Sequence, residues 1–96
     1  MVEEKKFLEL VANWEYQVRY EKSARTILLH PGMTEIILLG HDAVPLLLKT
    51  LKDNWYLAYA LYKITGFWPV RDEFAGNEER IIDSWLKWGL KNGYKA

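Results

Sequence analysis

The segment from Gly40 to Gly66 constrains the fold more than any other, because it predicts two short helices joined with almost no loop. At 100° per residue, the second helix has two apolar faces. One face is aliphatic and the other is aromatic: Leu57, Leu61 and Ile64 against Trp55, Tyr59 and Tyr62. A helix that is apolar all round has to be covered on both sides. Either the rest of this chain covers the aromatic face, or a partner does.

The first of these two helices has its own boundary signals. Asp42 is an expected N-cap, and Pro45 falls in the first turn, where a missing N–H does no harm. Its apolar face has helical spacing and consists of Val44, Leu47, Leu48 and Leu51. Asp53 and Asn54 close this helix and cap the next, so we expect residues 42–65 to pack as an antiparallel hairpin.

The chain before the hairpin also has a helical pattern. A long amphipathic helix is predicted from Glu3 to Lys22, with an apolar row formed by Phe7, Val11, Trp14 and Val18. Residues 26–29 are compatible with an extended segment or a helical turn. His30 and Pro31 mark a break, where His30 is expected in a turn or capping role and Pro31 can begin a helix that runs to Gly40.

After the hairpin, a loop of about ten residues leads to a last helix. Asn77 is its expected N-cap, Trp85 and Trp88 lie on its apolar face, and Gly93 is expected to end it. No segment carries the alternation and turn residues of a strand hairpin. We therefore predict one all-α domain over residues 1–96, a compact bundle of four to five helices around the hairpin.

Several residues of the hairpin resemble a known repeat. Gly40, the run Ala43-Val44-Pro45-x-Leu47-Leu48, and the later Ile64-Thr65-Gly66 are similar to the pattern of HEAT-type helical repeats. With Trp85-Leu86-x-Trp88-Gly89, they give residues 30–90 a resemblance to a family of small bacterial HEAT-like proteins. The resemblance implies a helical architecture and protein binding, and it implies no catalytic residues.

Composition excludes several function classes. Thirteen basic residues balance thirteen acidic ones, so net charge gives no attraction to nucleic acid or to an anionic membrane. There are no cysteines, which excludes thiolate chemistry and disulfides. The N-terminal segment lacks the apolar stretch of a secretory signal, and no apolar run is long enough to span a membrane. A cytoplasmic protein without a membrane segment is expected.

Catalytic and metal-binding patterns are weak. His41 and Asp42 suggest a metal pair, but metal chemistry needs more ligands, and His30 is the only other histidine. The chain has no nucleophile elbow and no glycine-rich phosphate loop. We expect no catalytic residues, no metal and no cofactor.

The aromatic face and the loop after it are the candidate partner-binding site. Tryptophan and tyrosine are enriched where proteins bind each other, because they bury a large area and keep a polar tip. The predicted contact residues are Trp55, Tyr56, Tyr59, Tyr62, Trp68 and Arg71. The opposite interpretation is that these rings pack inside, against Trp85 and Trp88 or against Trp14. In the same way, residues 67–70 either plug the core or protrude.

Three interaction functions remain open from this pattern. The first is a non-enzymatic protein-interaction module, an accessory or neutralising partner of another protein. The second is a homodimer that covers the aromatic face of each copy. The third is weak nucleic-acid binding, if two sets of basic residues adjoin: Arg19, Lys22 and Arg25 with Lys87, Lys91 and Lys95. Neighbouring glutamates make these basic sets more typical of solvated helix faces.

Overall fold

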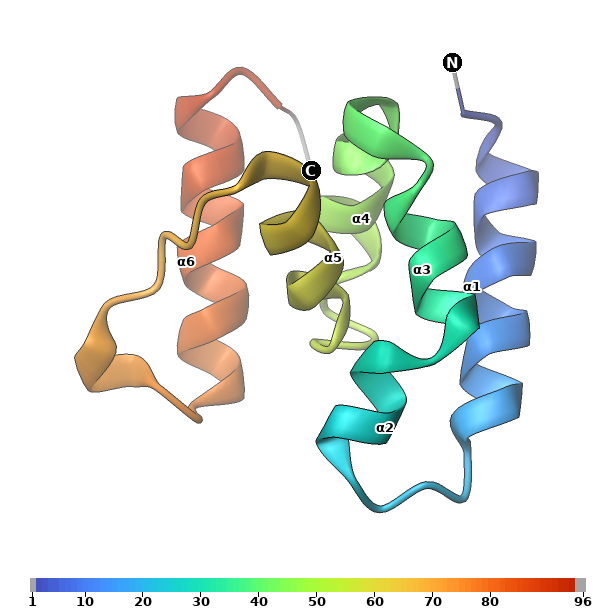
Figure 1. Cartoon of the computed structure of the whole chain (residues 1–96). Helices are drawn as coiled ribbons and strands as arrows, with labels where there is room; N and C mark the ends of the chain where they lie inside the picture. The colour runs from blue at the N-terminus through green and yellow to red at the C-terminus, as the bar shows by residue number, and fades with distance from the viewer. Residues whose placement is uncertain (1, 95–96) are drawn as a thin grey trace.

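The computed structural model describes residues 2–94, which form six α-helices and two short 3-10 helices (Figure 1). The all-α prediction is confirmed. The elements are α1 (Glu4–Val18), α2 (Ala24–Leu29), α3 (Pro31–Ile37), η1 (Gly40–Ala43), α4 (Val44–Thr50), α5 (Leu57–Thr65), η2 (Asp72–Phe74) and α6 (Glu78–Lys91). The radius of gyration is 12.7 Å, close to the roughly 12.5 Å expected of a compact domain of this length. Within residues 2–94, no helix is both long and apolar enough to cross a membrane.

Helix α1 buries the predicted apolar row: Phe7, Val11, Trp14 and Val18. The helix ends at Val18, four residues before the predicted end. The reason lies in the next turn of the sequence, where Glu21 and Lys22 stand at the positions that would continue the buried row. With no apolar side chain to bury there, the chain turns and starts α2, so residues 26–29 are helical.

His30 and Pro31 separate α2 from α3 as predicted. Pro31 is the first residue of α3, and the Gly32 N–H donates to Nδ1 of His30 at 2.9 Å, so this histidine is a cap. Gly32 lets α3 approach α1 closely, since a Cβ at this position would lie 2.9 Å from Cβ of Trp14. The Trp14 indole in turn donates from Nε1 to the carbonyl of Ile27 at 3.0 Å.

The start of α4 differs from the prediction. Asp42 lies inside η1, and the N-cap of α4 is Ala43, which makes no side-chain capping bond. Because η1 leads directly into α4, the Val44 N–H donates to the carbonyl of His41 in the preceding turn. This backbone bond satisfies an N–H group at the start of α4, which the prediction had paired with the carboxylate of Asp42.

The start of α5 also differs. The chain between α4 and α5 forms a turn in which the Tyr56 N–H donates to Oδ1 of Asn54 at 3.1 Å. The following N–H groups of Leu57 and Ala58 bond to the carbonyls three residues before them, which is the tighter 3-10 pattern. Trp55 therefore lies in the turn and does not share a helix face with Tyr59.

The C-terminal helix follows its sequence signals. Asn77 caps α6, because its Oδ1 accepts from the Arg80 N–H at 3.1 Å. At the other end, the N–H groups of Gly93 and Tyr94 donate to the carbonyls of Leu90 and Gly89 at 3.2 and 2.8 Å. These two bonds form a Schellman motif, and Gly93 ends the helix as predicted.

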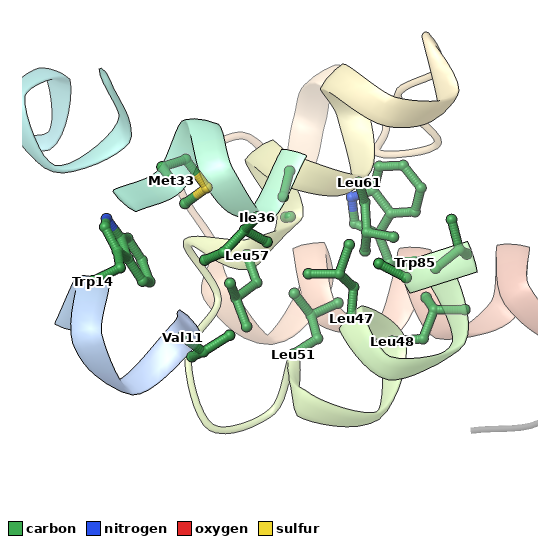
Figure 2. Packing of buried hydrophobic residues seen from close by; sticks show 14 of the residues in the cluster. Val11, Trp14, Met33, Ile36, Leu47, Leu48, Leu51, Leu57, Leu61 and Trp85 are labelled. Carbon is green, nitrogen blue, oxygen red and sulfur yellow. The ribbon is translucent and has the colours of Figure 1, made fainter. Parts of the chain in front are cut away.

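All six α-helices contribute to one core, and Figure 2 labels its residues from α1 and from α3 to α6. Leu57 and Leu61 on the aliphatic face of α5 are fully buried, together with Leu47, Leu48 and Leu51. Helices α4 and α5 pack against each other, and α4 and α5 also contact α6. The aliphatic face of α5 is thus covered within the chain. The next point is what covers its aromatic face.

Candidate partner-binding surface

A small groove runs beside α5 on its aromatic side. We call it the aromatic groove, and its lining comes from α2, from the turn before α5, from α5 itself and from the loop after it: Leu28, Trp55, Tyr56, Ala58, Tyr59 and Trp68. The groove has a volume of about 110 Å³ and an almost entirely apolar lining. Four of the six predicted contact residues therefore meet around one hollow.

A second, shallower hollow continues from the groove. Tyr59, Tyr62 and Trp68 line it, so Tyr59 and Trp68 are shared by both hollows. Tyr62 is 42% exposed, Trp68 is 43% exposed, and the neighbouring Phe67 is 51% exposed. Large exposed apolar side chains that lie together are typical of interaction surfaces. The aromatic face of α5 is thus only partly covered by the described chain.

Ring contacts connect this surface to the core. The Tyr62 ring meets the edge of Trp68 at a centroid distance of 5.9 Å, and Trp68 meets Trp85 at 6.0 Å. Both pairs are near-perpendicular, which is a favourable geometry for aromatic rings. Trp85 is fully buried in α6, so the contact with its ring restrains the Trp68 ring. Its exposed side therefore loses little conformational freedom when something binds to it.

The structure places Trp55 and Tyr56 differently from the aromatics of α5. They lie in the turn before the helix, half-buried, with their rings stacked at 4.7 Å. Tyr59 is half-buried on α5. The tyrosines and Trp68 thus combine the two interpretations of the sequence, since each packs partly against the chain and partly faces solvent.

Arg71 has a separate environment. It is exposed, and its Nε forms an ion pair with Glu73 at 2.7 Å. It is not part of the lining of either hollow. The loop that carries it does reach the core, but through Val70, which is buried. Residues 67–70 therefore both plug the core and protrude.

Sequence reasoning missed two residues of the groove, Leu28 and Ala58. Leu28 comes from α2, and its contact with α5 depends on how the helices pack, which no local pattern encodes. Ala58 had a signal, since a small residue one turn from aromatic side chains leaves space between them. Phe67, next to Trp68 in the sequence, is also exposed but lines neither hollow.

The histidines and carboxylates of the described chain do not form a metal site. Within the described part of the chain, no three histidine, aspartate or glutamate side chains are arranged to hold a metal ion. His30 accepts the capping bond described above. Other carboxylates are paired at the surface: Glu15 accepts from Asn54 at 2.8 Å, and Asp83 pairs with Lys87 at 3.1 Å.

The two basic sets do not form one stripe. Arg19 follows the end of α1 and Arg25 lies in α2, whereas Lys87 and Lys91 lie near the end of α6. These two regions are at opposite ends of the molecule (Figure 1). Lys95, which completes the second set in the sequence, lies outside the described residues.

No protein-family model, curated protein or solved structure matches this chain. The resemblance to HEAT-type repeats therefore stays a prediction from the sequence.

Proposed function

We propose that this protein is a non-enzymatic interaction module, an accessory or neutralising partner of another protein, and that its aromatic groove receives an apolar side chain of that partner. The observation that carries the proposal is the apolar groove with Trp68 fixed on the buried Trp85. Rigid aromatic residues around a small pocket are typical of the residues that dominate binding energy at interfaces.

The size of the groove supports a side chain as the occupant. Pockets for drug-sized molecules have about 300–1,000 Å³, several times the 110 Å³ of the groove. The hollow that continues from it has about 390 Å³ but is more open to solvent, so it offers a contact surface and does not enclose a ligand. An apolar cavity of about 150 Å³ holds one benzene ring. One leucine-sized or phenyl-sized group is therefore the expected occupant, with the shallower hollow beside it giving further contact area.

The chemistry of the lining supports binding over catalysis. Among the described residues, those that line the groove include no carboxylate, imidazole or ammonium group. General acid–base and nucleophilic catalysis need such groups at the reacting atoms. The tyrosine hydroxyls remain, and at the rim of an interface they serve as hydrogen-bonding groups.

The test compares capture of proteins from the source cell by three forms of the chain. The double variant Tyr59→Ala/Trp68→Ala removes the shared wall of both hollows. Its control is Tyr16→Ala/Tyr20→Ala, which removes two exposed tyrosines of the α1 end. We expect a specific partner to be lost with the first variant and retained with the control, while circular dichroism stays helical. A molten or unfolded double variant would show instead that Tyr59 and Trp68 are core residues, and Tyr62→Ala, which lies outside the core, then serves as the binding variant. Identical capture by all three forms would contradict the proposal.

Self-association is the second proposal for the same surface, because a symmetric dimer would cover the exposed rings of both copies. Light scattering at micromolar concentration distinguishes it from binding to another protein. A mass that doubles for the unmodified chain, and stays that of a monomer for Tyr59→Ala/Trp68→Ala, would favour the dimer. Nucleic-acid binding is a third proposal, and it requires an affinity that falls steeply with added salt.

A further inference from the structure

The two helices that line the aromatic groove carry charges of one sign. The lining comes from α2 and α5, from the turn before α5 and from the loop after it. Neither α2 nor α5 contains an acidic residue, and their charged residues are Arg25 and Lys63. Lys22 precedes α2 and Arg71 follows the loop, with Glu21 and Asp72 as their neighbours in the sequence. In a chain with no net charge, both helices of the groove are thus cationic.

Two of these cations lie one helical turn from a residue that lines the groove. Arg25 stands one helical turn before Leu28 on α2, and Lys63 stands one turn after Tyr59 on α5, so each neighbours a lining residue. Both side chains are exposed, and within residues 2–94 neither forms an ion pair. Arg71 differs, because Glu73 already neutralises it.

Two acidic residues line a neighbouring hollow beyond Tyr56. A separate hollow on that side contains Glu15 and Glu21 together with Arg19. Glu15 accepts a hydrogen bond from Asn54 there. The ring of Tyr56 lines both hollows, so the acidic groups lie on its other side. Arg25 and Lys63 are not part of the hollow that contains these carboxylates.

We infer that the partner segment recognised by the aromatic groove is an acidic peptide with an apolar anchor side chain; this inference rests on the proposed function. The anchor fills the groove, and flanking carboxylates lie near Arg25 and Lys63. Complementary charges at the rim raise the association rate and select among partners that share the same anchor. A second copy of this chain fits less well, since a two-fold axis through the groove brings like cations together.

The groove favours a peptide over a nucleic acid. A nucleobase carries hydrogen-bonding groups along its edge, and burying them in an apolar lining without partners is unfavourable. Leucine or phenylalanine has no such groups. Single-stranded nucleic acid also needs a basic path along several phosphates, whereas two unpaired cations flank this groove.

The probe for the test is a displayed library of random peptides, selected on the immobilised full chain. Groove-dependent peptides are those that bind the unmodified protein and the Tyr16→Ala/Tyr20→Ala control but are lost with both Trp68→Ala, which alters the groove, and Tyr62→Ala, which alters the adjoining hollow and leaves the core intact. We expect these peptides to be net negative and to contain leucine, phenylalanine or tryptophan. Groove-dependent peptides without a net negative charge would overturn the inference and leave the proposed function standing. Finding no groove-dependent peptide would overturn both.

A charge variant tests the same point without touching the groove. Arg25→Glu/Lys63→Glu reverses two exposed charges, and its control, Lys5→Glu/Lys6→Glu, makes the same change of net charge at exposed positions of α1. We expect the first to weaken acidic peptides about five- to tenfold and the control to leave them within about twofold. Equal effects of both variants would overturn the inference. Competition by a single-stranded oligonucleotide for the bound peptides would assign the surface to nucleic acid instead.

Discussion

Two helical glycines should respond differently to the same substitution. Gly32 in α3 and Gly89 in α6 are both buried, and both would place a new Cβ against another element. At position 32 the new atom meets Trp14 of α1, at 2.9 Å from its Cβ and 3.2 Å from its backbone Cα. At position 89 it meets the Cδ1 methyl of Leu48 at 2.7 Å. The first obstacle cannot rotate, whereas the second is the end of a flexible side chain.

The magnitudes follow from this difference. Replacing glycine by alanine where the backbone is helical stabilises by up to about 1 kcal/mol at either site. For Gly32→Ala, the helices α1 and α3 have to move apart, and overpacking of this kind costs about 1–3 kcal/mol. The net loss is up to about 2 kcal/mol. For Gly89→Ala, Leu48 changes its side-chain torsions at about 0.5–1.5 kcal/mol, so the net change is within about 0.5 kcal/mol.

Urea unfolding followed by circular dichroism at constant pH measures both values. We expect Gly32→Ala to lower the free energy of unfolding by up to about 2 kcal/mol and the melting temperature by up to roughly 15 °C, while Gly89→Ala stays close to the unmodified chain. The slope of the urea transition should not change, since the exposed surface is the same. If both variants lose equal stability, or if Gly89→Ala loses more, then the distinction between backbone and side-chain obstacles is wrong.

Three further substitutions test the core and the helix ends by the same unfolding measurement. Trp14→Phe removes the indole donor to the Ile27 carbonyl and should cost about 1–3 kcal/mol; an unchanged stability would show that this bond contributes nothing. Asn77→Ala should cost about 1 kcal/mol, because α6 loses its cap, whereas Asn77→Asp should retain it. Leu61→Ala in the core should cost about 2–5 kcal/mol, against less than about 0.5 for its control Leu38→Ala, a leucine that is 78% exposed.

The features that the sequence predicted correctly depend on residues close together in the chain. The buried row of α1, the His30 cap and the Asn77 cap each involve side chains and N–H groups within four positions or at helical spacing. The Schellman motif at Gly93 is equally local. Short-range geometry of this kind is the same in most proteins, so residue identity is enough to predict it.

The errors arose where a neighbouring element changed the local outcome. Asp42 is a reasonable cap by itself, but η1 supplies backbone bonds to the start of α4 and displaces the cap. Trp55 has the spacing of the α5 aromatics, but the turn closed by Asn54 delays the helix until Leu57. In the groove, Leu28 joins Tyr59 only because the helices pack in this arrangement. Helical spacing alone could therefore identify the aromatic residues but not the hollow between them.

Trp68 connects the candidate site to the core, and this decides how binding variants have to be interpreted. Its ring contacts the buried Trp85, so Trp68→Ala exposes part of the core and lowers stability whether or not a partner exists. Tyr62 touches Trp68 and lies outside the cluster of core residues. Its loss therefore removes exposed contact area with little effect on folding. A variant Tyr62→Ala that keeps its stability and loses affinity would show that the surface binds, whereas lost stability at Trp68 would report only on packing.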